Sequence, residues 1–184
     1  GGRIWAESQL GQGSHFFFTL PKYHLEEVLT EFLRNGIVQA RERRGSFSIV
    51  MLSVAEFHHL KARYDSEAIA QLLRDLEQGV KEAVRKRAGD VVVRWQQGEI
   101  IVILAEVDKT GALTIVDRIK RLLEQHTYRL GQTDERVSII VSSATYPEEA
   151  QEAEQLLQIA QGRLRKSARP KVRLMVVDDE PKIR

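Results

Sequence analysis

The sequence predicts an α+β fold whose centre is a β-α-β-β-α-β unit, an antiparallel sheet with both helices on one face. Apolar residues recur at helical spacing around Ile69–Val84 and Leu113–Leu123, which predicts the two helices. Between them, Gln96-Gln97-Gly98 has the length and composition of a tight hairpin turn. The four β-rich segments expected to form the sheet are Ser46–Val54, Asp90–Trp95, Glu99–Leu104 and Arg136–Ala144.

The first segment of the chain predicts a β-hairpin. Arg3–Ser8 alternates apolar and polar residues, and His15–Leu20 is rich in aromatic residues. Gly11-Gln12-Gly13 lies between them and supplies the flexible connection. Pro21 ends the hairpin, since proline cannot donate to a strand ladder.

One helix is expected before the first central strand and two after it. Lys22–Arg43 is the first, with Asn35-Gly36 as a point where it loosens or breaks, and Glu56–Tyr64 is a short second one. Asp65 or Ser66 caps the third, which runs to about Arg87. The apolar residues of the first helix are Leu25, Val28, Leu29, Phe32, Leu33 and Ile37.

The C-terminal half predicts two further helices and a strand. Thr110–His126 is a helix, and Pro147 is expected to open the next one at its first turn. Val172–Val177 is the final, C-terminal strand. The residues of Thr110–His126 expected to face inward are Leu113, Val116, Ile119, Leu122 and Leu123.

Composition excludes several classes of protein. Apolar residues make up 42% and charged residues 29% of the 184, which is typical of a globular chain. A net charge of +2 gives no reason to expect nucleic acid as a partner, and without cysteine no disulfide framework is possible. The longest apolar run, Ile100–Ala105, is far too short to cross a membrane. We expect this segment to be cytoplasmic and without membrane contact. If it belongs to a larger, membrane-anchored protein, the anchor is expected outside these residues.

The central domain, residues 22–170, resembles the GGDEF family, the diguanylate cyclases of bacterial signalling. The segment MLSVAEF (Met51–Phe57) lies where the family has a strand ending in LDxDxF. RWQQGEIIVIL (Arg94–Leu104) stands in place of RYGGDEFxxLL, and VSIIVSSATYP (Val137–Pro147) in place of the VTxSxGxA strand. The resemblance implies a palm-like fold shared with nucleotide cyclases. Family members join two GTP molecules with the help of metal ions.

The departures from the family pattern bear on catalysis. The first metal carboxylate falls on Ser53, and the carboxylate of the signature hairpin falls on Gly98. Magnesium prefers hard, charged oxygen ligands such as carboxylates, and neither Ser53 nor Gly98 carries a carboxylate. Only Glu99 keeps an acid of the signature. The other replaced positions are Ala55 for the second aspartate of the strand, Gln96 and Gln97 for the two glycines, and Lys61 for the guanine-reading asparagine.

One family feature is retained. Arg87-Ala88-Gly89-Asp90 matches the RxxD motif, five residues before the signature, with which many members bind cyclic di-GMP. The resemblance therefore implies cyclic di-GMP as a ligand of Arg87 and Asp90, because a guanidinium pairs with phosphate or a guanine edge. The alternative is purely structural: Arg87 ends a helix, and Asp90 begins a strand.

The two ends resemble parts of other domains. Residues 1–21 resemble the end of a histidine-kinase ATPase domain, and Gly11 and Gly13 match the glycine-rich box of its nucleotide site. Residues 171–184 resemble the start of a response-regulator receiver domain, where Asp178 and Asp179 would be the Mg²⁺-holding acidic pair. These resemblances imply a parent protein that uses ATP and Mg²⁺, whereas this segment is expected to hold no cofactor.

Together, these observations predict a non-catalytic GGDEF-like domain within a hybrid two-component sensor histidine kinase, a parent that takes part in a phosphorelay. Expected partners are other domains of the same protein, cyclic di-GMP and a second copy of the chain. One alternative is an active diguanylate cyclase that uses Glu99 with a carboxylate such as Glu56. Another is a plain dimerisation or spacer module built on Lys22–Arg43. His58-His59 is not expected to bind a metal, because adjacent helical side chains diverge and no third ligand is near.

Overall fold

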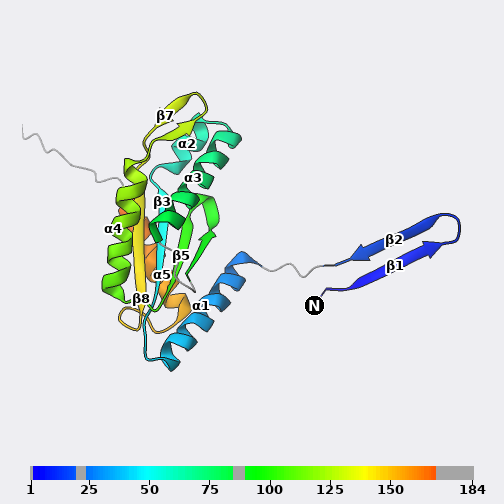
Figure 1. Cartoon of the computed structure of the whole chain (residues 1–184), viewed down its shortest axis with the longest axis horizontal. Helices are drawn as coiled ribbons and strands as arrows, with labels where there is room; N and C mark the ends of the chain where they lie inside the picture. Colours follow the sequence, from blue (N-terminus) through cyan, green and yellow to red (C-terminus); the bar gives the residue numbers. More distant parts are fainter. Residues whose placement is uncertain (1, 20–23, 85–89, 169–184) are drawn as a thin grey trace, which may run out of the picture.

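The structure is a computed structural model that describes residues 2–19, 24–84 and 90–168 (Figure 1). Helices and strands alternate along most of its length. The helices are α1 (Leu25–Glu42), α2 (Phe57–Arg63), α3 (Ser66–Val84), α4 (Lys109–Gln125) and α5 (Ala153–Ala168), with one 3₁₀ turn, η1 (Gln96–Gly98). The strands are β1 (Ile4–Gln9), β2 (Gly13–Phe18), β3 (Phe47–Val54), β4 (Val91–Arg94), β5 (Ile100–Ala105), β6 (Tyr128–Leu130), β7 (Thr133–Glu135) and β8 (Ile139–Tyr146).

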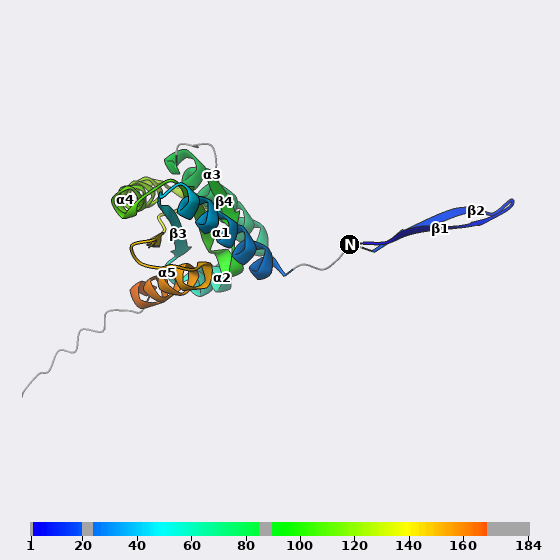
Figure 2. The same cartoon turned by 90° about the horizontal axis from the view of Figure 1, so that it is seen from below.

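The central sheet has four strands in the order β4-β5-β3-β8, and all neighbours are antiparallel. Helices α3 and α4 pack with one face of the sheet, while α1 and α5 pack with the other. Figure 2 views this arrangement end-on to the layers. The predicted β-α-β-β-α-β order and the placing of both inner helices on one face are confirmed.

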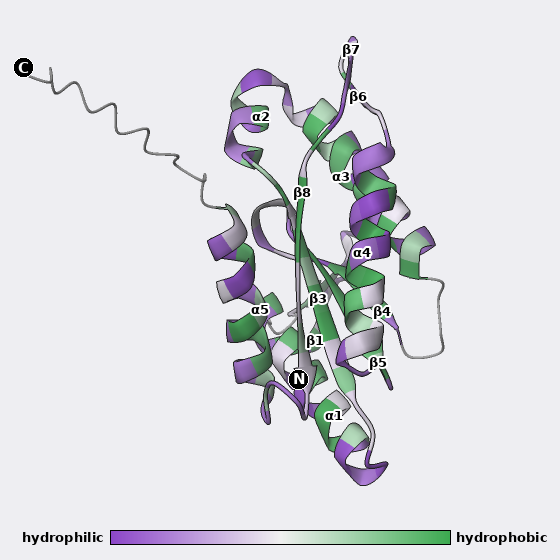
Figure 3. Cartoon of the chain, turned by 90° about the vertical axis from the view of Figure 1, so that its left-hand side faces the viewer, coloured by the Kyte–Doolittle hydropathy of each residue, from purple (hydrophilic) through white to green (hydrophobic). Residues whose placement is uncertain are grey.

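Alternation along β3 explains why the sheet is buried on both faces. Val50, Leu52 and Val54 contact the side of α3 and α4. Phe47 and Met51 contact the opposite side, with α1 and α5. Because both faces are covered, β3 is apolar along nearly its whole length, and Figure 3 shows the hydrophobic strands between helices with polar outer turns.

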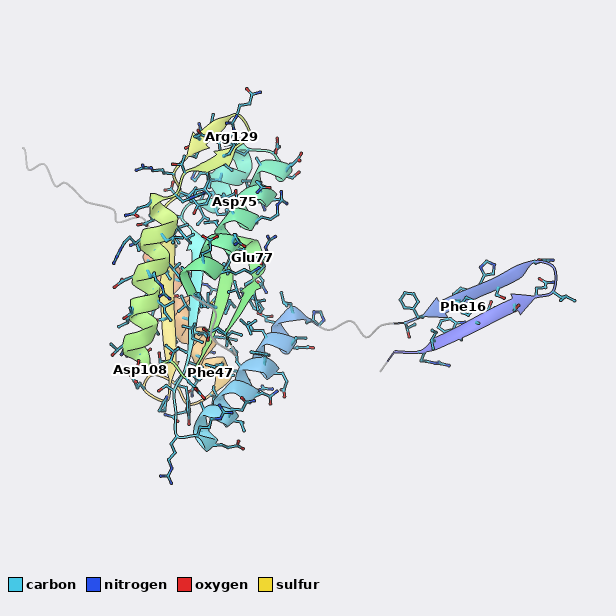
Figure 4. The ribbon with its side chains drawn as sticks, viewed as in Figure 1. Phe16, Phe47, Asp75, Glu77, Asp108 and Arg129 are labelled. Atoms are coloured by element: carbon cyan, nitrogen blue, oxygen red, sulfur yellow. The ribbon has the colours of Figure 1, made fainter. Side chains whose placement is uncertain are left out.

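Local chemistry fixes the ends and the continuity of the helices. The Asp65 carboxylate accepts a hydrogen bond from the Ala68 amide at 2.8 Å, which confirms Asp65 as a cap of α3. Helix α1 continues through Gly36, where the sequence had indicated a loosening. A Cβ at Gly36 would lie 2.3 Å from the ring of Phe47, so the glycine lets α1 approach the sheet (Figure 4).

The inward face of α4 differs from the prediction. Leu113 and Leu122 were expected in the core, but they are 49% and 38% exposed. The buried residues are Ala112, Ile115, Ile119 and Leu123. The helix is rotated so that the small side chain of Ala112 faces the core, and this leaves Leu113 and Leu122 at its margin.

The helix after β8 also begins later than predicted. Pro147 lies in a turn, and α5 starts at Ala153. The Thr145 carbonyl accepts from the amides of Glu149 and Ala150, at 2.8 and 3.3 Å. These bonds reverse the chain before a helix can form.

A hairpin that the sequence did not predict, β6–β7, lies between α4 and β8. Its strands have three residues each, too short for a periodic pattern to show. Tyr128 and Leu130 are buried in the core beside α3 and α4. The tip holds Gly131 at a φ of +63°, a conformation that favours glycine.

The predicted N-terminal hairpin is confirmed as the antiparallel pair β1–β2, with Ile4 opposite Phe18. Every residue of both strands is exposed. The predicted strand Val172–Val177 lies outside the described residues. Within the described ranges, none of the helices is long and apolar enough to span a membrane.

Candidate functional site

The segments that carry the signature pattern meet at one end of the sheet. Leu52 of β3 lies opposite Ile100 of β5, so the residues after β3 lie beside η1. Gly98 has a φ of +85°, and a Cβ there would lie 2.7 Å from the ring of Phe57. The turn therefore requires glycine both for its backbone and for its contact with Phe57.

The positions of the family's metal ligands offer little to a cation. Ser53 is paired with Ile140 across β3 and β8. The Ala55 amide donates to the Ser138 carbonyl at 2.8 Å, which extends the pairing beyond the strand. Gly98 has no side chain. In residues 2–19, 24–84 and 90–168, no group of three or more His, Cys, Asp or Glu residues is placed to hold a metal.

Glu99 is the acid that remains in the signature. Its carbonyl accepts from the Trp95 amide at 2.7 Å, which closes the turn between β4 and β5. Burial raises the pKa of the Glu99 carboxyl, and the positive charge of Arg165 on α5 opposes this shift. Trp95 is itself buried, in the cluster that α1 and α5 form with the sheet.

The other residues considered at this end are exposed and are not arranged to coordinate a metal. Glu56 precedes α2 with a φ of +52°, and its exposed side chain makes no cap bond to the helix. Lys61 is exposed on α2. The rings of His58 and His59 lie 4.0 Å apart, so the expectation that they diverge was wrong. They still belong to no three-ligand group in the described part of the chain.

The RxxD motif is described only in part. Arg87 lies outside the described residues. Asp90 is half-buried, and its carboxylate accepts from the Ala105 amide at 3.3 Å. Arg94, a neighbour on β4, forms an ion pair at 2.5 Å with Glu77 of α3. Hydrogen bonding by Lys81, together with Arg94, lowers the pKa of the Glu77 carboxyl.

A cationic hollow that the sequence did not single out lies between α3 and α4. Its volume is about 470 Å³. The Nε of Arg118 is buried there and has no hydrogen-bond partner among the described residues. The signal was present in the spacing of α4, where Arg121 and Gln125 follow Arg118 at intervals of three and four residues. The lining residues are Glu82, Arg118, Arg121, Leu122, Gln125 and His126.

The predicted sites at the two ends remain predictions. Gly11 lies in the connection between β1 and β2 and Gly13 begins β2, with φ of +79° and +94° and open space around them. These angles explain the glycines by turn geometry alone. Asp178 and Asp179 lie outside the described residues.

Comparison with known proteins agrees with the fold. Residues 26–171 match the family model described as diguanylate cyclase, GGDEF domain. Diguanylate cyclase A of Treponema denticola is 22% identical over 146 residues. This match covers 79% of the chain but only 36% of the relative, so the chain spans about a third of that protein's length.

Two solved structures have the same fold. The GGDEF domain of YfiN (TpbB) from Pseudomonas aeruginosa superposes with a TM-score of 0.71 at 22% identity, covering 77% of this chain and 88% of that one. The second comprises the coiled coil and GGDEF domain of DgcB from Caulobacter crescentus in complex with c-di-GMP. Its TM-score is 0.67 at 12% identity, with 77% of this chain and 74% of that one covered.

Proposed function

Because the chain belongs to the GGDEF domain family, we propose that its central domain is a non-catalytic domain for signalling and interaction. One observation carries the proposal: the resemblance to the family aligns Ser53 and Gly98 with its metal carboxylates, and both residues lie at the same end of the sheet. Joining two GTP molecules requires metal ions that neutralise charge on the transferring phosphate. A serine hydroxyl and a glycine cannot replace two carboxylates as ligands of Mg²⁺.

The packing at the turn supports the same proposal. The ring of Phe57 lies against Gly98, so a carboxylate side chain introduced at position 98 would collide with Phe57. The remaining acid, Glu99, has a raised pKa because it is partly buried, which disfavours the ionised form that a metal requires.

Metal binding tests this part directly. Free Mn²⁺ gives a strong paramagnetic resonance signal that disappears on coordination. We expect the signal of added Mn²⁺ to be the same with the protein and with buffer. Saturable binding that is abolished in Glu99→Gln would show that a metal site has survived.

We further propose that the domain belongs to a hybrid two-component histidine kinase, between its ATPase and receiver domains. The support is the resemblance of residues 1–21 and 171–184 to parts of those domains. In such a parent, ATP and Mg²⁺ are used by the kinase and receiver, in the cytoplasm, and those domains are partners of this one. Sequencing the gene on both sides tests the proposal: we expect an ATP-binding asparagine box upstream and a phospho-accepting aspartate downstream.

As its ligand we propose cyclic di-GMP, held by Arg87 and Asp90. One arginine pairs with only part of a ligand that carries two phosphates, so a second cation is needed. Arg94 is a poor candidate because it is already paired with Glu77. Arg118 is a better candidate, since its Nε is buried and has no hydrogen-bond partner among the described residues.

Calorimetric titration with cyclic di-GMP tests the ligand. We expect binding to wild type and a loss of at least about tenfold in affinity in Arg87→Ala and in Arg118→Ala. Arg129→Ala is the matched control, because the Arg129 side chain is exposed on β6. Equal binding by all variants, or none by wild type at high micromolar ligand, would refute cyclic di-GMP as the ligand of this site. The proposal that the domain is non-catalytic would be unaffected.

A further inference from the structure

The β1–β2 hairpin has an apolar face that nothing in the described residues covers. Side chains alternate across a strand, so every second pair of opposed residues lies on the same face. An isolated two-stranded hairpin is marginally stable in water, and a surface that covers its apolar face stabilises it. The pairs on this face, which we call the hairpin face, are Ile4–Phe18, Ala6–Phe16 and Ser8–Ser14.

Helix α1 also leaves apolar residues uncovered. One side of the helix is buried against the sheet and α5. On the adjoining side, Leu25, Val28 and Phe32 are 51%, 49% and 46% exposed. The exposed Asn35 and Gln39 continue the same line toward the C-terminal end of α1, at intervals of three and four residues. We call these five residues the α1 flank.

The hairpin face and the α1 flank show the same order of polarity, counted from the connection between them. On the hairpin, the apolar pairs lie nearest the connection, and Ser8 and Ser14 lie nearest the tip, with their hydroxyls 2.8 Å apart. On α1, the apolar residues come first and the amides of Asn35 and Gln39 follow. A hairpin folded back along α1 therefore sets apolar side chains against apolar ones and hydroxyls against amides.

The two surfaces also match in length. From Phe18 to Ser14 a strand extends about 14 Å, and from Leu25 to Asn35 a helix rises about 15 Å. Phe18 is then level with Leu25, and Ser14 is level with Asn35. The connection, residues 19–24, provides about 20 Å of chain at full extension. This length allows the hairpin to reverse onto the helix.

No charge is buried by such a contact. None of the residues of the hairpin face or the α1 flank is charged. Glu7 and its partner His15 lie on the other face of the hairpin, together with the stacked rings of Trp5 and Phe17. That face remains toward solvent when the hairpin face is covered.

We propose that the hairpin face packs on the α1 flank of the same chain. Figure 1 shows the hairpin extending away from α1, so the contact requires the hairpin to fold back. The short connection gives the two surfaces a high effective concentration, which a second copy or another protein has to exceed. This inference goes beyond the function proposed above and does not depend on cyclic di-GMP. In a hybrid-kinase parent, the contact would attach the end of the ATPase domain to the central domain.

Disulfide trapping tests the contact, since the chain has no cysteine to interfere. Ser14→Cys with Asn35→Cys should form a disulfide within one chain at least about tenfold faster than either of two matched pairs. The first pair uses His15→Cys in place of Ser14→Cys, which moves the thiol to the other hairpin face. The second uses Arg34→Cys in place of Asn35→Cys, which moves it to the side of α1 that faces Glu154.

Equal rates for the three pairs of cysteines would contradict the proposal. Disulfides that form between chains would also contradict it, because they would mean that a second copy covers the hairpin face. Dimers and monomers with an internal disulfide are separated by electrophoresis without reducing agent.

Amide hydrogen exchange in the full chain tests the burial separately. A hairpin held only by its own pairing should exchange almost as fast as an unfolded peptide. We expect the β1–β2 amides of wild type to exchange at least about tenfold more slowly than that. Phe32→Glu should abolish this protection, because it places a charge in the α1 flank.

Val38→Glu is the matched control for exchange, because Val38 is similarly exposed, at 50%, on another side of α1. It should leave the protection of the hairpin unchanged. Circular dichroism establishes that each variant is folded. Wild-type hairpin amides that exchange at the rate of an unfolded peptide, or equal effects of Phe32→Glu and Val38→Glu, would overturn the proposal.

Discussion

Glu99 and Glu149 are carboxylates at opposite ends of the same sheet, and their surroundings shift their pKa values in opposite directions. Burial raises the pKa of Glu99, with Arg165 as a weaker opposing charge. Burial alone would also raise the pKa of Glu149, but hydrogen bonds from Arg163 and Lys109 outweigh it and lower the pKa. The ionised form of Glu99 is therefore poorly stabilised, whereas that of Glu149 is stabilised by hydrogen bonds from two cations.

The end of the sheet that holds Glu149 is a connected polar network. The Glu149 carboxylate is 8% exposed and accepts from Arg163 at 2.7 Å, with Lys109 at 3.1 Å. It also accepts from the Thr145 amide at 3.1 Å. The buried Ser48 hydroxyl lies 2.8 Å from that of Thr145 and donates to the Val107 carbonyl at 2.7 Å.

The difference indicates that the polar network supporting this fold lies at the end of the sheet opposite Ser53 and Gly98. The signature end has Ser53 and Gly98 where carboxylates are expected, yet the sheet and its helices are complete. The network at the other end ties β3 and β8 to α4 and α5. Serine and glycine at the signature end are therefore compatible with an intact fold.

The largest loss of folding stability is expected from Glu149→Ala. The change leaves Arg163 and Lys109 without their shared partner and the Thr145 amide without an acceptor. We expect a loss of about 2–3 kcal/mol in the free energy of unfolding, reduced from a fully buried case because both cations are half-exposed. Urea denaturation measures it, with Glu148→Ala, an exposed neighbour, as the control. A loss equal to that of Glu148→Ala would break the comparison.

Gly98→Ala is expected to cost about 2 kcal/mol. The methyl group requires an unfavourable φ and meets the ring of Phe57. Gly131→Ala separates the two causes, because Gly131 has a φ of +63° with open space around it and should lose only about 1 kcal/mol. Thermal and urea unfolding measure both variants. Equal losses would mean that the contact with Phe57 contributes nothing.

Ser48→Ala is expected to cost about 1–2 kcal/mol. The hydroxyl is fully buried, and its removal leaves the Thr145 hydroxyl and the Val107 carbonyl each short of a hydrogen bond. Ser53→Ala, the matched change at the other end of β3, should cost less than about 0.5 kcal/mol, since Ser53 is only half-buried. The reverse order in urea denaturation would contradict the assignment of the supporting network to the Ser48 end.

The pH dependence gives the smallest effect, and the two glutamates should show it with opposite signs. The stability that Glu149 contributes is present above its unfolded pKa and is lost as the pH falls through its lower folded pKa. For Glu99 the relative stability is present below its unfolded pKa and is lost as the pH rises through its raised folded pKa.

Glu99→Gln should therefore gain less than about 1 kcal/mol over wild type at pH 7, and the gain should vanish in acid. Glu149→Gln should instead lose stability at pH 7 and approach wild type in acid. Urea denaturation at several pH values from 3 to 7 measures both profiles. Profiles of the same sign would show that the two carboxylates are not in contrasting surroundings.

Much of the fold could be predicted because its signals are periodic and local. The alternation in β3 and the glycine of the 96–98 turn identify the hairpin and the buried sheet, and Asp65 identifies a helix start. The β6–β7 hairpin escaped because three residues carry no period. The inward face of α4 was misassigned because Leu113 and Ala112 are both apolar, and only packing decides between them.

The candidate site was less predictable, since it depends on contacts between distant residues. That Ser53 and Gly98 lie at the same sheet end follows from the antiparallel pairing of β3 with β5, whereas the sequence indicated only the order of the elements along the chain. The contact of Phe57 with Gly98 and the pairing of Arg94 with Glu77 are set by side-chain packing. Arg118 was missed because a cation on an outer helix face is usually solvated, and the burial of its Nε becomes apparent only in three dimensions.

Turnover of GTP tests the central claim, that this domain is not a cyclase, most directly. The chain is incubated with GTP and Mg²⁺ or Mn²⁺ at concentrations high enough to populate a weak dimer, and products are separated by chromatography. We expect no cyclic di-GMP above a control without protein, and the same result for Glu99→Gln. Product that accumulates with wild type and is lost in Glu99→Gln would contradict the account.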